Sequence, residues 1–222
     1  MAKVVCFLAL TGLVLWSDAQ GLVDEIRQLY RIDQLPRFRT GMVEQFSSYD
    51  RTGKNDDGFK GTYSYIRKEG DAQVIAEMKG PGVINRIYWA ANSLQDTIQF
   101  FFDNEKEPRI NMPFYNLFAG NLFPFLNPVC GHEVGGYYCY LPIPYEKSCK
   151  VVFLGKMKFY QVQFRTYPED TKIRTFSMVW DESKKETLFE AVRTWNMVGS
   201  NYLNDVYKKL YTKDTTVELS PG

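Results

Sequence analysis

Residues 159–166 have the sequence Phe-Tyr-Gln-Val-Gln-Phe-Arg-Thr, in which apolar side chains at 160, 162 and 164 alternate with polar ones at 161, 163 and 165. This period of two indicates a β-strand with one buried and one solvated face. Turn residues such as Gly80-Pro81-Gly82 separate further strand-length runs of apolar and β-branched residues. The eight expected strands are Thr62–Lys68, Ala72–Met78, Val83–Ala90, Thr97–Asp103, Tyr137–Ile143, Lys150–Leu154, Phe159–Thr166 and Arg174–Trp180. Eight short strands without helices between them predict an all-β fold, a jelly roll or similar two-sheet sandwich.

Helical periodicity appears only on either side of this β-rich region. Apolar residues recur at helical spacing from Leu22 to Tyr30, which predicts a short amphipathic helix. After Asp181 the period returns, first through Leu188, Val192 and Trp195 and then through Tyr202, Val206 and Leu210. We therefore expect an N-terminal helix and entry segment over 20–45, a jelly-roll domain over 46–180, and a helical linker over 181–222.

The first nineteen residues have the order of a secretory signal. Lys3 precedes an apolar run over 4–16, and small or polar residues at 17–19 follow it. The alternative is a transmembrane anchor, but the run is too short to cross ~30 Å of hydrocarbon comfortably. We expect cleavage near Ala19 and a secreted or periplasmic product.

Composition narrows the classes of function that this chain can have. The net charge of +1 leaves no basic stripe of the kind that nucleic acids require. An aromatic content of 16% suits a β-rich or a carbohydrate-handling domain. The single histidine, His132, and the lack of a Cys-x-x-Cys motif leave little for a zinc site or a nucleophilic triad, so we expect no cofactor and no metal. Cys139 and Cys149 are candidates for a pair across neighbouring strands, with buried free thiols as the commoner alternative.

The densest polar stretch lies between Phe46 and Phe59 and combines carboxylates, a guanidinium, an amide and hydroxyls. Sugars are bound by this mixture of planar donors and acceptors beside an aromatic face. The alternatives are a solvated turn and an irregular calcium loop, although Lys54 occupies a position where an EF-hand needs an oxygen ligand. Trp89, at the end of an apolar strand, is either a wall of the sugar site or a core residue. The candidate sugar-binding residues are Ser48, Tyr49, Asp50, Arg51, Asn55, Asp56, Asp57 and Trp89.

Several segments together resemble glycoside hydrolase family 172, formerly the DUF2961 family. The most specific is Gln45-Phe46-Ser47-Ser48-Tyr49-Asp50-Arg51. The others are Asn55-Asp56-Asp57-Gly58, Gly80-Pro81-Gly82 with Asn85-Arg86-Ile87-Tyr88-Trp89, Phe102-Asp103-Asn104-Glu105, Gly135-Gly136-Tyr137-Tyr138, Leu141-Pro142-Ile143-Pro144 and Tyr160-Gln161-Val162. The resemblance covers the chain from about Leu22 to its end.

The resemblance implies a bacterial protein with two jelly rolls per chain that assembles into trimers or hexamers. It implies retaining hydrolysis of fructofuranoside or arabinofuranoside linkages by two glutamates in the second jelly roll. We therefore expect this chain to be the N-terminal half of a secreted furanosidase, which binds a furanose-containing oligo- or polysaccharide and is not catalytic alone. No spacing singles out a catalytic pair among its own carboxylates. The rival hypotheses are a non-catalytic carbohydrate-binding module and a structural jelly roll that mediates assembly.

Overall fold

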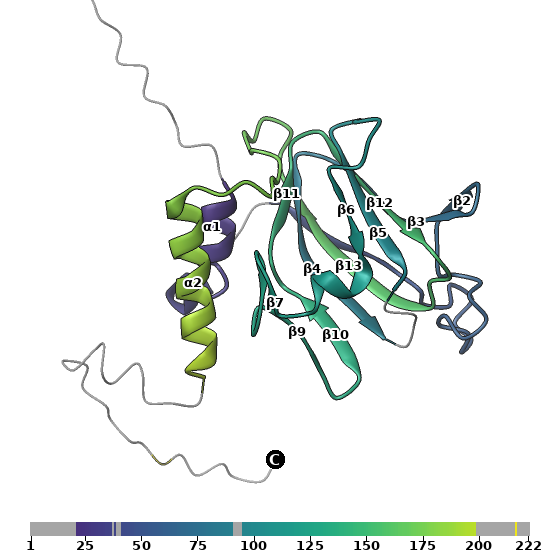
Figure 1. Ribbon diagram of the computed structural model, residues 1–222, viewed down its shortest axis with the longest axis horizontal. Helices are drawn as coiled ribbons and strands as arrows, with labels where there is room; N and C mark the ends of the chain where they lie inside the picture. The colour runs from purple at the N-terminus through teal and green to yellow at the C-terminus, as the bar shows by residue number, and fades with distance from the viewer. Residues whose placement is uncertain (1–20, 37, 39–40, 91–94, 199–215, 217–222) are drawn as a thin grey trace, which may run out of the picture.

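The structure, a computed structural model, describes residues 21–36, 38, 41–90, 95–198 and 216. Two antiparallel sheets pack face to face, and two helices lie side by side at the flank of this sandwich (Figure 1). The predicted all-β, two-sheet class is confirmed. The expected signal segment over 1–19 and the helical pattern through Tyr202, Val206 and Leu210 lie outside the described residues.

The first sheet is built around β13, the strand in which apolar and polar residues alternate. Its order is β1-β13-β4-β10-β9, and β11 also pairs with β4. The register places Phe46 opposite Val162 and Tyr160 opposite Trp89, so these four side chains face the same way. The bounds are β1 Met42–Ser47, β4 Gly82–Ala90, β9 Cys130–Glu133, β10 Gly136–Cys139, β11 Ile143–Tyr145 and β13 Phe159–Thr166.

The second sheet has the order β2-β3-β12-β5-β6. The β3–β12 register shifts between Val151 and Val152, as at a β-bulge. The bounds are β2 Arg67–Glu69, β3 Ala72–Lys79, β5 Thr97–Phe102, β6 Ile110–Pro113 and β12 Ser148–Leu154. A small hairpin of β7 Asn121–Leu122 and β8 Phe125–Leu126, and a 3-10 turn η2 Phe114–Leu117, complete this region.

The core lies between the sheets and is rich in aromatic rings. Phe100, Phe114, Phe118 and Phe153 are fully buried, and Phe114 packs edge-on against both Phe118 and Phe153. A hydrogen bond also crosses from sheet to sheet, because Tyr160 Oη donates to the Ile75 carbonyl of β3 at 2.9 Å. Aromatic burial and this bond fix the stacking of the two sheets.

The helices are α1 Leu22–Arg27, followed by the 3-10 turn η1 Ile32–Gln34, and α2 Glu182–Asn196. Both confirm the sequence periodicity: Leu22 and Ile26 of α1 are buried, as is Leu188 of α2. Asp181 caps α2 by accepting a hydrogen bond from the Lys184 amide at 3.0 Å. In Figure 1 the two helices run alongside each other, near the sheet that contains β4 and β11. No helix among the described residues has the length and apolar character needed to cross a bilayer.

Some expected strands differ from those observed. Residues 62–66 form turns, and only Arg67–Glu69 is a strand. The expected strand Arg174–Trp180 is wrong: the Phe176 amide donates to the Pro144 carbonyl of β11, and the Phe176 carbonyl accepts from the Arg109 side chain, so this segment makes separate contacts instead of a strand ladder. The sheet also begins at Met42, ahead of the expected domain boundary at residue 46. The short strands β6 and β9 were not predicted, because neither has a full alternating pattern.

Candidate functional site

The predicted sugar-binding loop follows β1 and is anchored on β13 through Ser48. The Ser48 amide donates to the Tyr160 carbonyl at 3.2 Å, and the Tyr160 amide donates to Ser48 Oγ at 3.3 Å. Ser48 Oγ in turn donates to the Asp57 carbonyl at 3.0 Å. Ser48 therefore joins the two ends of the polar stretch to the sheet, and the position of the loop depends on β13.

Asp50 organises the loop from within. Only 6% of this residue is exposed. Its Oδ1 accepts hydrogen bonds from the Thr52 amide at 2.9 Å and the Thr52 hydroxyl at 2.7 Å, and its Oδ2 accepts from the Asp56 amide at 3.2 Å. These bonds, led by the one from the Thr52 hydroxyl, lower the pKa of Asp50 below its usual value. The carboxylate is thus ionised at neutral pH and holds the turn in shape.

The neighbouring acidic residues also bond within the loop. Asp57 Oδ1 accepts from the Asp50 amide at 2.7 Å, and Asp56 Oδ1 accepts from the Lys60 amide at 2.7 Å. Gly58 has φ +109°, and a Cβ there would lie 2.7 Å from the Lys158 carbonyl oxygen. Only glycine fits this close approach. The structure therefore brings Asp50, Asp56 and Asp57 together, but as parts of one folded turn; Asn55 is exposed at its edge.

Arg51 lies on the outer side of the loop, between two tyrosine rings. Its guanidinium carbon is 4.5 Å from the centroid of Tyr49 and 5.1 Å from that of Tyr63. Arg51 donates to the backbone carbonyls of Ser47 at 2.7 Å and Tyr49 at 2.5 Å, and it does not pair with Asp50. Tyr49 is 57% exposed. The loop therefore presents a cation between aromatic rings to solvent, held by the backbone behind it.

Trp89 is not part of this surface. It is fully buried, 4.5 Å from the Tyr137 ring and 4.8 Å from the Phe114 ring, measured between centroids. On β4 it faces inward with its register partner Tyr160, whose hydroxyl reaches the other sheet. The interpretation of Trp89 as a wall of a sugar site is therefore corrected: it is a core residue, the alternative that the end of an apolar strand also allowed.

The sequence pattern missed Tyr63, the second ring beside Arg51. Residue 63 falls inside the expected strand Thr62–Lys68, where an aromatic side chain needs no functional explanation. The structure instead places 62–66 in turns that fold back on the loop. A tyrosine twelve positions from Arg51 leaves no local spacing signal that could have identified it.

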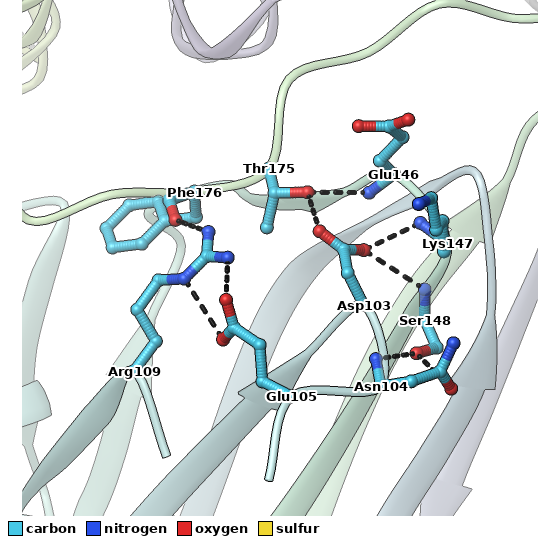
Figure 2. A network of polar contacts seen from close by, with 9 residues as sticks. All are labelled: Asp103, Asn104, Glu105, Arg109, Glu146, Lys147, Ser148, Thr175 and Phe176. Atoms are coloured by element: carbon cyan, nitrogen blue, oxygen red, sulfur yellow. Dashed lines mark hydrogen bonds and ion pairs between the residues drawn. The ribbon is translucent and has the colours of Figure 1, made fainter. Parts of the chain in front are cut away.

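A second polar region lies at another part of the sandwich. A cavity of about 680 Å³ is lined by residues 80–81, 146–147 and 169–174, and none of the predicted site residues lines it. Beside it, Asp103 Oδ1 accepts from the Lys147 amide at 2.7 Å and the Ser148 amide at 3.3 Å, and Asp103 Oδ2 accepts from the Thr175 hydroxyl (Figure 2). Both oxygens of Asp103 are engaged by neighbouring residues, so this carboxylate joins three segments of the chain.

The same network continues through Arg109, which bridges to Glu105 and donates to the Phe176 carbonyl at 2.9 Å (Figure 2). Among the described residues, no group of three or more His, Cys, Asp or Glu side chains has the arrangement of a metal site. His132 is exposed on β9 and contacts the Tyr137 ring, with centroids 5.5 Å apart. The loop around Arg51 therefore remains the strongest candidate for ligand contact.

Comparison with known families decides the classification. A family model described as the GH172 first beta-sandwich domain matches residues 40–184. The chain belongs to glycoside hydrolase family 172. The match contains every strand of both sheets and the whole loop from Ser48 to Gly58, and it confirms the expected N-terminal portion of the family. A comparison with curated proteins found no match.

Proposed function

We propose that this family 172 chain is the sugar-contacting, N-terminal half of a secreted furanosidase, and that it does not hydrolyse glycosides alone. The observation that carries the proposal is the match to the first sandwich of a glycoside hydrolase family, together with an ordered polar loop inside the matched region. The expected substrates are fructofuranoside or arabinofuranoside linkages, cleaved with retention by a pair of carboxylates ~5–5.5 Å apart. That pair is expected in the second jelly roll of the family.

The contact surface in this proposal is Arg51 with Tyr49 and Tyr63. A guanidinium carries five N–H donors in a fixed fork. The hydrogen bonds to the carbonyls of Ser47, Tyr49 and Tyr63 use three of them. Two donors thus remain to reach neighbouring sugar hydroxyls, while the tyrosine rings offer faces for the C–H side of a sugar ring. Backbone bonds hold the guanidinium in place, so little side-chain entropy is lost on binding.

Asp50 has a supporting role in this proposal. Its carboxylate fixes the turn that carries Arg51, because it accepts hydrogen bonds from the Thr52 amide and hydroxyl and from the Asp56 amide. Asp50, one of the candidate sugar-binding residues, thus contributes to sugar contact through the loop that it holds. Asn55, on the exposed edge, is a further candidate for sugar contact.

The test uses a complete two-domain family member or a restored full-length gene. Arg51→Met keeps an unbranched apolar stem that reaches as far as the arginine Nε but removes all five donors; Lys54→Met, at an exposed position of the same loop, is the matched control. We expect kcat/KM on a nitrophenyl arabinofuranoside or fructofuranoside to fall at least about tenfold for Arg51→Met, equivalent to ~1.4 kcal/mol. The control should be within a factor of about two. Unchanged activity, or a loss that follows a lowered melting temperature, would return the loop to a structural role.

A second assay addresses catalysis by the chain alone. The purified chain should release no nitrophenol above a boiled control. Turnover well above that control would overturn the non-catalytic part of the proposal and direct the search for a carboxylate pair to this chain. The family resemblance implies trimers or hexamers, so we also propose a homo-oligomer, checked by sedimentation velocity. Export is checked by mass spectrometry of the secreted protein, with an N-terminus expected near Gln20.

A further inference from the structure

The three described cysteines are divided between the two sheets. Cys149 lies on β12 of the second sheet, while Cys130 and Cys139 lie on β9 and β10 of the first sheet, directly opposite each other. The Sγ atoms of Cys130 and Cys139 are 3.3 Å apart, with the Cys130 thiol donating to the other sulfur. All three are buried free thiols, as the commoner alternative predicted. The contact to Cys139 comes from Cys130, and the suggested pairing of Cys139 with Cys149 has no support in this arrangement.

The register of the hairpin favours a covalent bond between the two facing thiols. The Tyr140 amide donates to the Val129 carbonyl at 3.0 Å, which makes residues 129 and 140 the hydrogen-bonded pair of the antiparallel ladder. Cys130 and Cys139, one step along, therefore occupy the alternate, non-hydrogen-bonded pair. At such pairs the Cα atoms are about 4.5 Å apart and the side chains approach most closely. That separation falls within the range of about 4.4–6.8 Å that disulfides span without backbone movement.

We propose that Cys130 and Cys139 are a redox pair that closes to an intrachain disulfide when the chain folds in an oxidising compartment. The two thiols lose two protons and two electrons, and one S–S bond forms. A disulfide-class oxidant, such as oxidised glutathione or a thiol–disulfide oxidoreductase, accepts both and is reduced to two thiols. Attack by one thiolate on that oxidant gives a mixed disulfide, which the second thiolate resolves.

Burial decides when this reaction takes place. Neither Cys130 nor Cys139 has exposed surface in the folded protein. Burial also raises the pKa of the Cys130 thiol, so little of this residue is in the reactive thiolate form in the folded chain. The bond therefore forms while the sheet is still open, and once the sheet has closed the same burial shields it from reductants.

The bond would secure a short edge strand of the first sheet. β9 has only four residues and pairs on one side, with β10. The turn that follows exposes Val134, which has φ +48°, a conformation that costs a branched residue energy. A covalent link at the base of this hairpin keeps β9 in register and holds the turn in its strained shape. His132, on the same short strand, is fixed with it.

The test compares the full chain made in a reducing cytosol with the full chain made in a cell whose cytosol is oxidising. Each sample is unfolded in guanidinium with an alkylating reagent and digested with a glutamate-specific protease. Glu133 separates the two cysteines, so the digest gives one peptide with Cys130 and another, over 134–146, with Cys139. From the oxidising cell we expect these two peptides to be joined, with a mass about two daltons below their sum, and Cys149 to be alkylated. The oxidised protein should also melt several degrees higher than the reduced protein.

Two variants serve as controls for the assignment of the link to Cys130 and Cys139. Cys149→Ser should keep the link between the two peptides. Cys130→Ser should lose both the link and the difference in melting temperature, and Cys139 should then be alkylated. Fully alkylated cysteines in both samples, or a link from Cys139 to the Cys149 peptide, would overturn the proposal. The readout does not depend on sugar binding, so its failure is distinct from failure of the proposed glycosidase role.

Discussion

Replacing Arg165 by methionine tests the contact that attaches helix α1 to the sheet. Arg165 Nη2 donates to both carboxylate oxygens of Glu25, at 2.8 and 2.9 Å, and to the Tyr167 hydroxyl at 2.7 Å. The Tyr167 hydroxyl in turn donates to Glu25. The two charged side chains are 7% and 1% exposed, and 140 residues of sequence separate them. The pair is therefore both buried and long-range.

The expected magnitude follows from that burial. Removing one partner of a buried ion pair leaves the other charge in the interior and costs about 3–5 kcal/mol. Arg165→Met should therefore lower the free energy of unfolding by about that amount. Exposed pairs contribute only about 0–1 kcal/mol. Arg67, which pairs with Glu77 at 2.6 Å with side chains 41% and 47% exposed, provides the matched control as Arg67→Met.

Urea unfolding followed by tryptophan fluorescence measures both variants. With a urea dependence of about 2–3 kcal/mol per molar, the Arg165→Met midpoint should fall by about 1–2 M and that of Arg67→Met by less than about 0.5 M. The double variant Glu25→Gln/Arg165→Met removes the stranded charge and should recover most of the loss. Equal effects at Arg165 and Arg67, or a double variant no better than Arg165→Met, would refute the reasoning.

Three further predictions address other parts of the molecule. Tyr160→Phe removes the hydrogen bond from one sheet to the Ile75 carbonyl of the other, and should cost about 0.5–1.5 kcal/mol of unfolding free energy in urea. Trp89→Leu should cost about 2–4 kcal/mol, because the fully buried indole fills the core; a variant of normal stability but weaker sugar binding would restore the wall-residue hypothesis. Because the pKa of Asp50 is lowered by the Thr52 hydroxyl, the stability it adds is present above about pH 4 and is lost as pH falls through the lowered pKa. The urea midpoints of wild type and Asp50→Asn should therefore converge as pH falls from about 7 to about 2, which equilibrium unfolding at several pH values measures.

The fold was predictable where a period of the sequence coincides with burial. β13, β4 and β5 each alternate between buried and more exposed positions or form continuous apolar runs, and all three were placed within a residue or two. The error at Arg174–Trp180 has the opposite cause. Its residues have strand-like composition, but the backbone partners of Phe176 are the Pro144 carbonyl of β11 and the Arg109 side chain, both distant in sequence. Tertiary partners of that kind leave no trace in local periodicity.

The site was predictable in composition but not in orientation. Polar density between Phe46 and Phe59 identified the loop and seven of the eight candidate residues; the eighth, Trp89, lies at the end of an apolar strand and is a core residue. Sequence alone cannot decide that Asp50 faces inward and Arg51 outward, since both residue types are common in exposed polar turns. That division is set by the Thr52 hydroxyl and by the Tyr63 ring, and both become partners only after the loop has closed.

Strand β13 carries two attachments at different points along its length, one to the polar loop and one to helix α1. Tyr160, near its start, holds the polar loop through Ser48, and Arg165, near its end, holds α1 through Glu25. Five residues of extended strand separate the two by about 17 Å, which is far beyond the reach of a hydrogen bond or a side-chain contact. A rigid strand paired on both sides transmits little distortion over that length. Loss of Arg165 should therefore lower stability without changing how the loop meets a sugar, whereas a change at Arg51 should do the reverse. Variants at these two residues therefore test the stability of the fold and the proposed sugar contact independently of each other.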